Sequence, residues 1–417
     1  MKFFFPDSLD LVDPSFDFET EQRAPLRLRQ RDDLYAHELF HDVPFTGILV
    51  AKTSVDGDRG ERSRYNLAQR HRLLRLGVRE FFRLDEIPGR PRLESIGDCG
   101  AFSYAKEKIP PYTVNEVVDF YRDCGFDYGV SVDHIIFEFD QAFDLPGAAV
   151  PFEVRERQNI TLELAAEFIQ RCAKPDCSFY PVGVAQGWSP QSYADSVDQL
   201  QKMGYDYIGL GGMVPLKTVD ILDSLRAIAK VRKPETKLHI FGVTRVKEVL
   251  TFADYGVKSL DSTSPLRQAF MDNKDNYYTL DRTYTALRVP QIDGNPKLNK
   301  SISTGKVNQD KARVLEQQCM RGLVAYQNKQ CPSDPVIDSL LEYDILQGGK
   351  GDRRKAYEET LGDRPWELCG CDICKQLGIH VLIFRGAERN RRRGFHNLYV
   401  FHRRLQREIN RSQLVGV

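Results

Sequence analysis

The chain has 417 residues, of which 41% are hydrophobic and 11% aromatic, so it carries enough apolar surface for a large core and does not resemble a disordered protein. Lysine and arginine together number 59, as do aspartate and glutamate, so the net charge of zero gives no global attraction to nucleic acid. A chain of this length fits one large α/β barrel or two to three ordinary domains.

The cysteines and the apolar runs indicate the compartment. Six of the nine cysteines show no regular disulfide spacing, and the FFF run near the N-terminus is too short for a signal peptide. No stretch approaches the roughly 20 apolar residues that cross a bilayer. We therefore expect a soluble protein of the reducing cytoplasm with no membrane partner. The six are Cys99, Cys124, Cys172, Cys177, Cys319 and Cys331.

From about residue 45 to 270, short apolar runs that end in polar residues alternate with amphipathic segments of helical length. The expected strands lie in TGILVAKTSV, LESIGDCGAF, YGVSVDHIIF, YPVGVAQG, YDYIGLGG, LHIFGV and VKSLDSTS. The expected helices lie in VNEVVDFYRDCG, TLELAAEFIQRCA, YADSVDQLQKMG and VDILDSLRAIAKV. Such alternation is typical of parallel βαβ units, and seven or eight units favour a (β/α)8 TIM barrel of the α/β class over a doubly wound sheet. The chain lacks the G-x-G-x-x-G turn that a dinucleotide fold would require.

We expect three parts along the chain. Residues 1–295 form the catalytic barrel with an N-terminal extension. Residues 296–350 form a polar excursion, in which DPVIDSLLEYDI predicts one short helix. Residues 351–417 form a zinc-binding subdomain that ends in a basic amphipathic helix, because apolar residues recur at helical spacing after His396. We expect that last helix to pack back onto the barrel.

The run CGCDIC places Cys369, Cys371 and Cys374 within six residues, and a histidine follows in GFHNLYVF. Three thiolates and one imidazole make a closed tetrahedral shell suited to a structural zinc ion, which leaves no coordination position for chemistry. The competing interpretation is that the cysteines crowd together by chance. We favour His396 as the fourth ligand, with His402 and His380 as alternatives.

Arginines crowd the segment around this histidine. Arginine pairs phosphate through two parallel hydrogen bonds, so this group predicts phosphate contacts, although a charge run can also be no more than a solvated face. The candidates are Arg391, Arg392, Arg393, Arg403 and Arg404.

Polar residues end several of the expected strands. Asp98 ends ESIGD, Asp133 ends YGVSVD, Gln186 ends YPVGVAQ and Asp261 ends VKSLD. Any one aspartate could be a helix cap or a turn residue. Function in a (β/α)8 barrel collects at the carboxyl ends of the strands, so three aspartates and a glutamine at equivalent ends predict an active site there.

The same residues resemble a known pattern. DCGAF, VD, VAQG, GLGGMVPL, FGV and GVKSLDSTSPLR are similar, in this order, to motifs of the tRNA-guanine transglycosylase superfamily, and C-x-C-x-x-C…HN falls where that family has its zinc signature. The resemblance covers roughly residues 45 to 410. The opening FFFPDSLDLVDPSFDFE, with YAHELF and GILVAKTSVD, resembles the DNA-guanine transglycosylases of 7-deazaguanine modification systems.

The resemblance implies a base exchange at C1′ of a nucleotide. Asp261 would be the nucleophile that forms a covalent glycosyl ester, and Asp98 the general acid/base. The base-binding residues that the resemblance implies are Asp133, Gln186, Gly211, Gly212, Phe102 and Phe241. The two phenylalanines would sandwich the base, or would be barrel core if the resemblance misleads.

The segment GGMVPLKT lacks the Gly-Glu that bacterial tRNA enzymes use to accept an aminomethyl base and is similar to the archaeal Val-Pro version. We therefore expect 7-cyano-7-deazaguanine (preQ0) as the incoming base, because Pro215 and Leu216 suit a neutral nitrile. Guanine in DNA is the expected target. Alternatives are the same exchange in tRNA and a non-catalytic subunit that binds nucleic acid. A stacked guanine must be flipped out or already single-stranded, so an accessory protein is a candidate partner.

Overall fold

The computed structural model describes residues 1–57, 64–85, 89–293 and 296–415, and the chain forms two compact units. The barrel unit contains Met1–Leu9, Phe45–Thr263 and Leu405–Val417, and the second unit contains Asp10–Pro44 and Ser264–Arg404. This division differs from the predicted boundaries after residues 295 and 350. The second unit begins directly after the last barrel strand, and it includes an N-terminal segment that pairs with distant parts of the chain.

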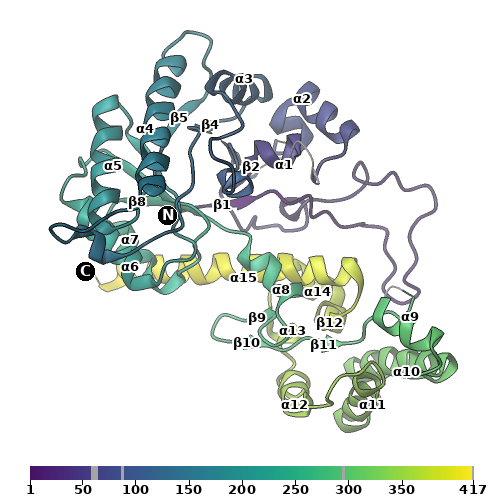
Figure 1. The fold of residues 1–417 in the computed structure, drawn as a ribbon. Helices are drawn as coiled ribbons and strands as arrows, with labels where there is room; N and C mark the ends of the chain where they lie inside the picture. Colours follow the sequence, from purple (N-terminus) through teal and green to yellow (C-terminus); the bar gives the residue numbers. More distant parts are fainter. Residues whose placement is uncertain (58–63, 86–88, 294–295, 416–417) are drawn as a thin grey trace. The chain divides into compact units, whose positions relative to one another are not determined.

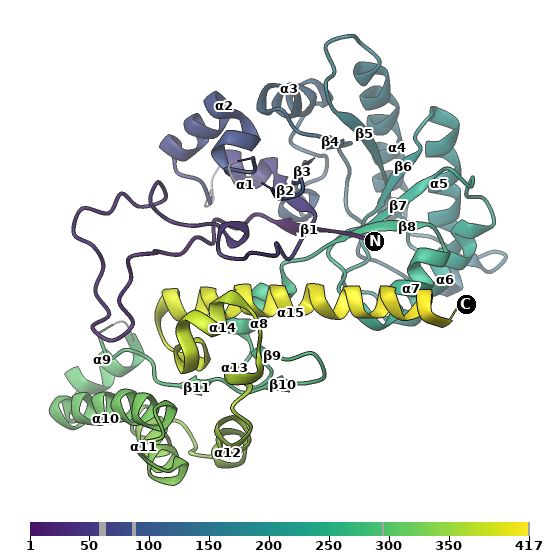
Figure 2. The same ribbon diagram turned by 180° about the vertical axis from the view of Figure 1, so that it is seen from behind.

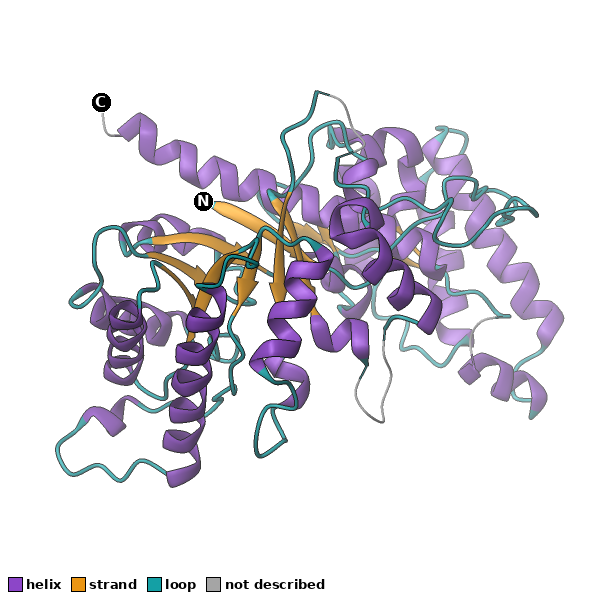
Figure 3. Cartoon of the chain, turned by 90° about the horizontal axis from the view of Figure 1, so that it is seen from above, coloured by secondary structure: helices purple, strands orange, loops and turns teal. Residues whose placement is uncertain are grey.

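Eight parallel strands close into a barrel, which confirms the predicted (β/α)8 fold (Figure 3). Each strand pairs with its neighbours in chain order, and β8 pairs with β1. The strands are β1 (Lys2–Pro6), β2 (Gly47–Ala51), β3 (Glu94–Asp98), β4 (Tyr128–Val130), β5 (Tyr180–Ala185), β6 (Tyr207–Leu210), β7 (Lys237–Ile240) and β8 (Val257–Asp261).

The strand β1 lies in what we predicted to be an N-terminal extension. Phe4 of β1 pairs with Gly47 of β2 on one side and with Asp261 of β8 on the other, so this strand closes the barrel. The neighbouring Phe3 is fully buried. An uninterrupted aromatic run is typical of a strand buried on both faces, as parallel barrel strands are.

Helices surround the strands (Figure 1). Several begin with the side-chain caps that the sequence carries: Thr113 and Glu116 make a reciprocal capping box at α3, and Ser189 caps α5. The helices of this unit are α1 (Lys52–Asp56), α2 (Leu67–Phe81), α3 (Val114–Cys124), α4 (Phe152–Cys172), α5 (Pro190–Met203), α6 (Thr218–Ala229) and α7 (Val249–Asp254).

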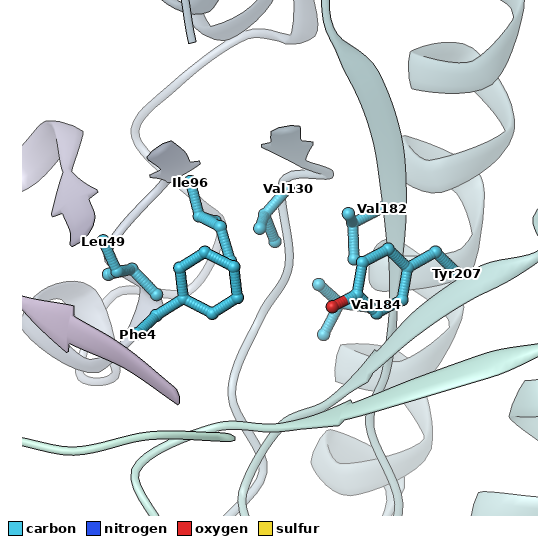
Figure 4. Close-up of a cluster of buried hydrophobic side chains, with 7 residues drawn as sticks. All are labelled: Phe4, Leu49, Ile96, Val130, Val182, Val184 and Tyr207. Carbon is cyan, nitrogen blue, oxygen red and sulfur yellow. The ribbon is translucent and has the colours of Figure 1, made fainter. Parts of the chain in front are cut away.

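The inside of the barrel is filled by side chains from consecutive strands (Figure 4). The buried members are Phe4, Leu49, Ile96, Val130, Val182, Val184 and Tyr207. This packed layer leaves the carboxyl ends of the strands as the place where polar side chains can gather, as in other barrels of this type.

The second unit is mostly helical. Where one short helix was predicted, the structure has three: α9 (Pro296–Ser303), α10 (Gln309–Gln327) and α11 (Ser333–Leu346). The polar outer face of α10 hid a buried stripe of Ala312, Leu315, Cys319 and Leu323 at helical spacing. Figure 2 shows α10 and α11 side by side.

Among the described residues, no helix is long and apolar enough to cross a membrane. The remaining helices and strands of the chain lead to the long last helix. They are α8 (Ser264–Met271), β9 (Tyr277–Tyr278), β10 (Thr283–Tyr284), β11 (Leu287–Arg288), α12 (Arg354–Asp363), α13 (Pro365–Leu368), α14 (Asp372–Leu377), β12 (Ile383–Phe384) and α15 (Gly386–Val415).

Candidate active site and metal-binding cluster

Asp133 and Gln186 meet at the carboxyl ends of β4 and β5. The Gln186 amide donates a hydrogen bond from Nε2 to Asp133 Oδ2 at 2.6 Å, and its Oε1 accepts from the backbone N–H of Ile136 at 3.2 Å. Both side chains are buried. The bond to Ile136 sets the amide orientation, so the second Nε2 hydrogen remains for a carbonyl, while the carboxylate can accept from N–H groups. This pair can therefore bind the amide edge of a purine.

Gly211 and Gly212 carry the backbone of the loop after β6 directly over this pair. A Cβ at Gly211 would lie 2.0 Å from Gln186 Nε2, and one at Gly212 would lie 2.5 Å from the carbonyl oxygen of Ile136. Gly212 also has a positive φ of 72°. Only glycine allows the chain to pass this close to the amide without moving it.

Asp98 is the last residue of β3, and its carboxyl accepts a hydrogen bond from the backbone N–H of Gly100 at 3.1 Å. Burial, and then the nearby negative charges of Asp133 and Asp261, raise the pKa of Asp98 to about 8. Burial likewise raises the pKa of Asp133 to about 6. At neutral pH Asp98 is therefore mostly a protonated acid that can give up a proton.

Asp261 is the last residue of β8, and its environment differs from that of Asp98. Its Oδ1 lies 3.0 Å from Nε2 of His239 and accepts a hydrogen bond from the backbone N–H of Gly242, also at 3.0 Å. Hydrogen-bond donors favour the charged form of a carboxylate. The barrel mouth therefore combines a carboxyl that holds a proton with one that is held by donors, as acid–base and nucleophilic roles require.

Two contributors to this site were missed by sequence reasoning. Cys99 is buried and donates from Sγ to Asp133 Oδ1 at 3.1 Å, and burial raises the pKa of this thiol so that it keeps its proton. His239 was also missed. It stands two positions before Phe241 on the strand LHIF, and an imidazole on a strand of such apolar character was the available signal.

The two predicted sandwich residues have different surroundings. Phe241 is half-buried, packs on the barrel core and contacts the ring of His239 edge-on at 4.5 Å between centroids. Phe102 is 70% exposed and meets the ring of Phe137 at 5.7 Å, so it is not barrel core. It lines a groove of about 1070 Å³ with Phe137 and Lys106. The sandwich itself stays a prediction.

Cys369, Cys371, Cys374 and His396 gather in the second unit, with their ligand atoms all within 4.8 Å of one another. His396 Nδ1 lies 3.6, 3.4 and 3.2 Å from the three sulfurs in chain order. A tetrahedral zinc shell with ordinary bond lengths has sulfur–nitrogen separations of roughly 3.5 Å. The four residues therefore fit a metal ion such as zinc.

Neighbouring residues orient this cluster as the outer partners of a metal site do. His396 Nε2 lies 2.8 Å from the carbonyl oxygen of Tyr278, which assigns the proton to Nε2 and leaves Nδ1 for the metal. The ring of Tyr277 stacks on that imidazole at 4.0 Å, and its hydroxyl lies 3.2 Å from Cys374 Sγ. The alternatives His380 and His402 are not part of the cluster.

The arginines near the metal cluster correct the predicted phosphate-binding face. Arg393 is fully buried and donates to the carbonyl oxygens of Ala269, Val381 and Ile383. Arg392 is buried and pairs with Glu388 at 2.6 Å. A guanidinium enclosed in this way has no face for a phosphate, so the prediction fails for these two residues.

The three other arginines are more accessible. Arg391 is half-buried and bonds to Asp10 and to the carbonyl oxygen of Leu11. Arg404 is half-buried and donates to the carbonyl oxygen of Thr279 at 2.8 Å. Arg403 is exposed, at the edge of a cleft that Tyr278, Tyr399 and Cys369 also line. Of the five candidates, Arg403 is therefore the one that presents its side chain to solvent.

A comparison with known proteins finds a relative that matches nearly the whole chain. The chain is 48% identical over 410 residues to a protein of Salmonella montevideo named DNA-guanine transglycosylase, and the match covers 97% of each chain. No family model matches the chain.

Proposed function

This chain belongs to the family of DNA-guanine transglycosylases, and from that premise we propose that it replaces guanine in DNA with preQ0 through a covalent glycosyl-aspartate intermediate. It is thus a guanine transglycosylase, which is a pentosyltransferase. The observation that carries the proposal is the cluster at the strand ends, where Asp98 holds a proton at neutral pH and Asp261 is held by donors.

The first half of the exchange breaks the bond between C1′ and N9 of guanine. Asp261 attacks C1′ with one carboxylate oxygen and forms a glycosyl ester, while the electron pair of the broken bond leaves with the base. Asp98, protonated at neutral pH, gives its proton to the departing guanine and becomes a carboxylate.

The second half reverses these events with a different base. The Asp98 carboxylate takes the N9 proton of preQ0, N9 attacks C1′, and the ester bond breaks with its electron pair returning to Asp261. The proton count closes because Asp98 ends as it began. A single residue can serve both halves because a pKa of about 8 lets it give and take a proton near neutral pH.

The pair of Asp133 and Gln186 would bind the shared edge of guanine and preQ0, with the carboxylate accepting from N1–H and the exocyclic amine and the amide donating to O6. What distinguishes the two bases is the 7-cyano group. The loop from Gly211 to Thr218 contains no acidic residue that would pair with an aminomethyl cation, which supports preQ0. Efficient use of the aminomethyl base with preQ0 ignored would overturn this choice.

We also propose that the Cys369, Cys371, Cys374 and His396 cluster holds a structural zinc ion. When bound, the ion supplies four strong bonds that join α14 to α15 and no open position for substrate. Arg403, the exposed member of the arginine group, is the proposed phosphate contact beside this cluster.

The test offers labelled preQ0 to the purified, zinc-loaded protein with DNA or with tRNA and measures the label retained in each polymer. We expect label in DNA, none with Asp261→Asn, and unchanged label with the control Asp198→Asn, whose half-buried carboxylate pairs only with Lys202 on its own helix among the described residues. Label only in tRNA would overturn the DNA substrate. No label in either polymer would overturn catalysis and favour a binding subunit.

A further inference from the structure

His239 lies on β7 and contacts two polar residues of the neighbouring barrel strand β8. It pairs in register with Ser259, and Asp261 lies two residues further along β8 on the same face of the strand. The imidazole, which is only 2% exposed, reaches both: Nδ1 lies 2.7 Å from Ser259 Oγ and Nε2 lies 3.0 Å from Asp261 Oδ1. Ser259 in turn contacts the hydroxyl of Tyr207 on β6 at 2.5 Å.

The direction of this hydrogen-bond series follows from counting protons. The Tyr207 hydroxyl is buried, burial raises its pKa so that it keeps its proton, and Ser259 is its one hydrogen-bond partner among the described residues. A buried donor without an acceptor is costly, so Tyr207 donates to Ser259. The Ser259 hydroxyl must then donate to His239 Nδ1, because its other neighbour already supplies a proton.

An Nδ1 that accepts a hydrogen bond carries no proton, so the ring is neutral and its proton lies on Nε2. This Nε2–H donates to Asp261 Oδ1. The opposite direction, with a charged imidazole donating to Ser259, would leave the hydroxyl proton of either Ser259 or Tyr207 without an acceptor in the part of the chain that the structure describes. The series therefore runs from Tyr207 through Ser259 and His239 to Asp261.

Both donors that reach Asp261 use the same oxygen. His239 Nε2 and the backbone N–H of Gly242 each bond to Oδ1 at 3.0 Å, and no described residue bonds to Oδ2. Two hydrogen bonds to one oxygen of a carboxylate fix the rotation of the group and leave its other oxygen available for reaction. When a glycosyl ester of an aspartate breaks, negative charge returns to the carboxylate. Hydrogen-bond donors that point at this carboxylate stabilise the returning charge and so speed the breaking of the ester.

We propose that His239 is a positioning residue for the nucleophile: its Nε2–H, fixed in that tautomer by Ser259 and Tyr207, holds Oδ1 of Asp261 so that Oδ2 attacks C1′. This rests on the proposed function of Asp261. In the first step the bond from Oδ2 to C1′ forms as C1′–N9 breaks. In the second step that ester bond breaks, its electron pair returns to the carboxylate, and the donor to Oδ1 stabilises the returning charge. His239 touches no substrate atom and gains or loses no proton.

The matched variants are His239→Gln, whose amide nitrogen can take the place of Nε2–H, and His239→Leu, which fills similar space without a donor. We expect His239→Leu to lower kcat by about 10²- to 10³-fold, as removal of one preorganised donor does, with KM changed less than about threefold. His239→Gln should stay within about tenfold of the wild-type kcat. Tyr207→Phe should lower kcat only a few-fold, because Ser259 keeps its bond to Nδ1.

The matched variants separate positioning from mere structural support. The ionisable groups that face Asp261 are His239 on β7 and Asp98 on β3. Loss of the donor to Oδ1 removes its stabilisation of the returning charge, so the loss should fall on kcat in His239→Leu, with KM little changed, and should be largely restored in His239→Gln. Equal losses in both variants, or a His239→Leu enzyme with unchanged kcat, would overturn the proposal.

Nitrogen-15 NMR of the histidine rings tests the same proposal without any activity. We expect the His239 signals, assigned by their loss in His239→Gln, to show a neutral ring protonated at Nε2. A ring protonated at Nδ1 would overturn the inference. If the wild-type protein incorporates no label while His239 shows the expected tautomer, the proposed function fails and the hydrogen-bond series remains. An active wild-type enzyme with the wrong tautomer would leave the proposed function standing and remove the role of His239.

Discussion

The barrel mouth and the Cys–His cluster both gather ionisable side chains in the interior, but they balance their charges in opposite ways. At the mouth, burial, and then the nearby negative charges of Asp133 and Asp261, raise the pKa of Asp98. In the cluster, three sulfurs and one nitrogen converge at distances that a cation would hold together. In the proposed function the mouth would therefore cost stability and supply chemistry, while the cluster with its metal bound would supply stability.

This contrast predicts that replacing one ionisable residue changes the stability of the fold in opposite directions in the two regions. At the mouth, a neutral replacement of Asp98 should slow the reaction strongly and stabilise the fold, which is the usual trade between stability and activity. In the cluster, loss of one ligand should weaken the metal site and the unit built around it.

The largest expected effect is that of Cys371→Ser. It should abolish zinc binding and lower Tm by more than about 10 °C, because a structural zinc site contributes many kcal/mol and each kcal/mol shifts Tm by a few degrees. Calorimetry and metal analysis would measure this. The matched control is Cys331→Ser, a half-buried cysteine on the loop before α11 whose Sγ lies 3.7 Å from the carbonyl oxygen of Gly322. Unchanged zinc content in Cys371→Ser would contradict the proposal that the cluster binds zinc.

Asp98→Asn should lower kcat by about 10³-fold and raise Tm above neutral pH. In the folded protein the pKa of Asp98 is about 8, above the unfolded value near 4, so between these values the folded state holds a proton that the unfolded state has lost. Stability therefore falls as pH rises through this window. Asparagine has no such proton, so the Tm advantage of the variant should grow from pH 4 to 8 and then level off.

The control for this pH series is Asp85→Asn. The hydrogen bond from Arg79 lowers the pKa of Asp85, so this carboxylate stabilises the fold when charged, and its loss should lower Tm slightly at neutral pH. A Tm for Asp98→Asn that lies below wild type at pH 8 would contradict the idea that the barrel mouth is destabilising.

Gly211→Ala should damage base recognition while sparing the nucleophile. The new methyl group would lie 2.0 Å from Gln186 Nε2 and push the amide away from Asp133. We expect KM for preQ0 to rise by about tenfold, the order of one lost hydrogen bond, with a smaller change in kcat. Steady-state kinetics would measure both, with Gly362→Ala as the control, since nothing lies within 4 Å of a Cβ there. An unchanged KM would indicate that Gln186 does not bind the base.

The two regions also differ in how far sequence alone could predict them. The three cysteines of the cluster lie close together in the chain, and their spacing predicted a metal site directly. The residues at the barrel mouth lie at the ends of separate strands. The equivalence of those strand ends, together with the resemblance to a known family, pointed to Asp98, Asp133 and Asp261 as one group. Strand β1 was missed because its partner β8 lies more than 250 residues away, so no local pattern announces the pairing.

The arginines show the limit of local pattern most clearly. Arg385 and Arg389 pair with Glu21, a residue at the other end of the chain. A run of basic residues does not reveal that its counter-charges come from elsewhere in the sequence. For the same reason the role of His239 was hard to predict from the sequence. Its partners Ser259 and Asp261 become its neighbours only when β7 and β8 pair.

The smallest expected effect belongs to Arg403→Ala. Because this side chain is exposed, we expect Tm to change by less than about 1 °C and DNA affinity to fall only a few-fold, as for one exposed phosphate contact. The slope of log K against log salt should become shallower by about 0.9, the value for one phosphate contact. Arg393→Met should behave in the opposite way, leaving that slope unchanged and lowering Tm, because its buried guanidinium satisfies carbonyl oxygens of Ala269, Val381 and Ile383. A changed salt slope in Arg393→Met would show that DNA reaches a residue that the fold encloses, and the division between structural and binding arginines would fail.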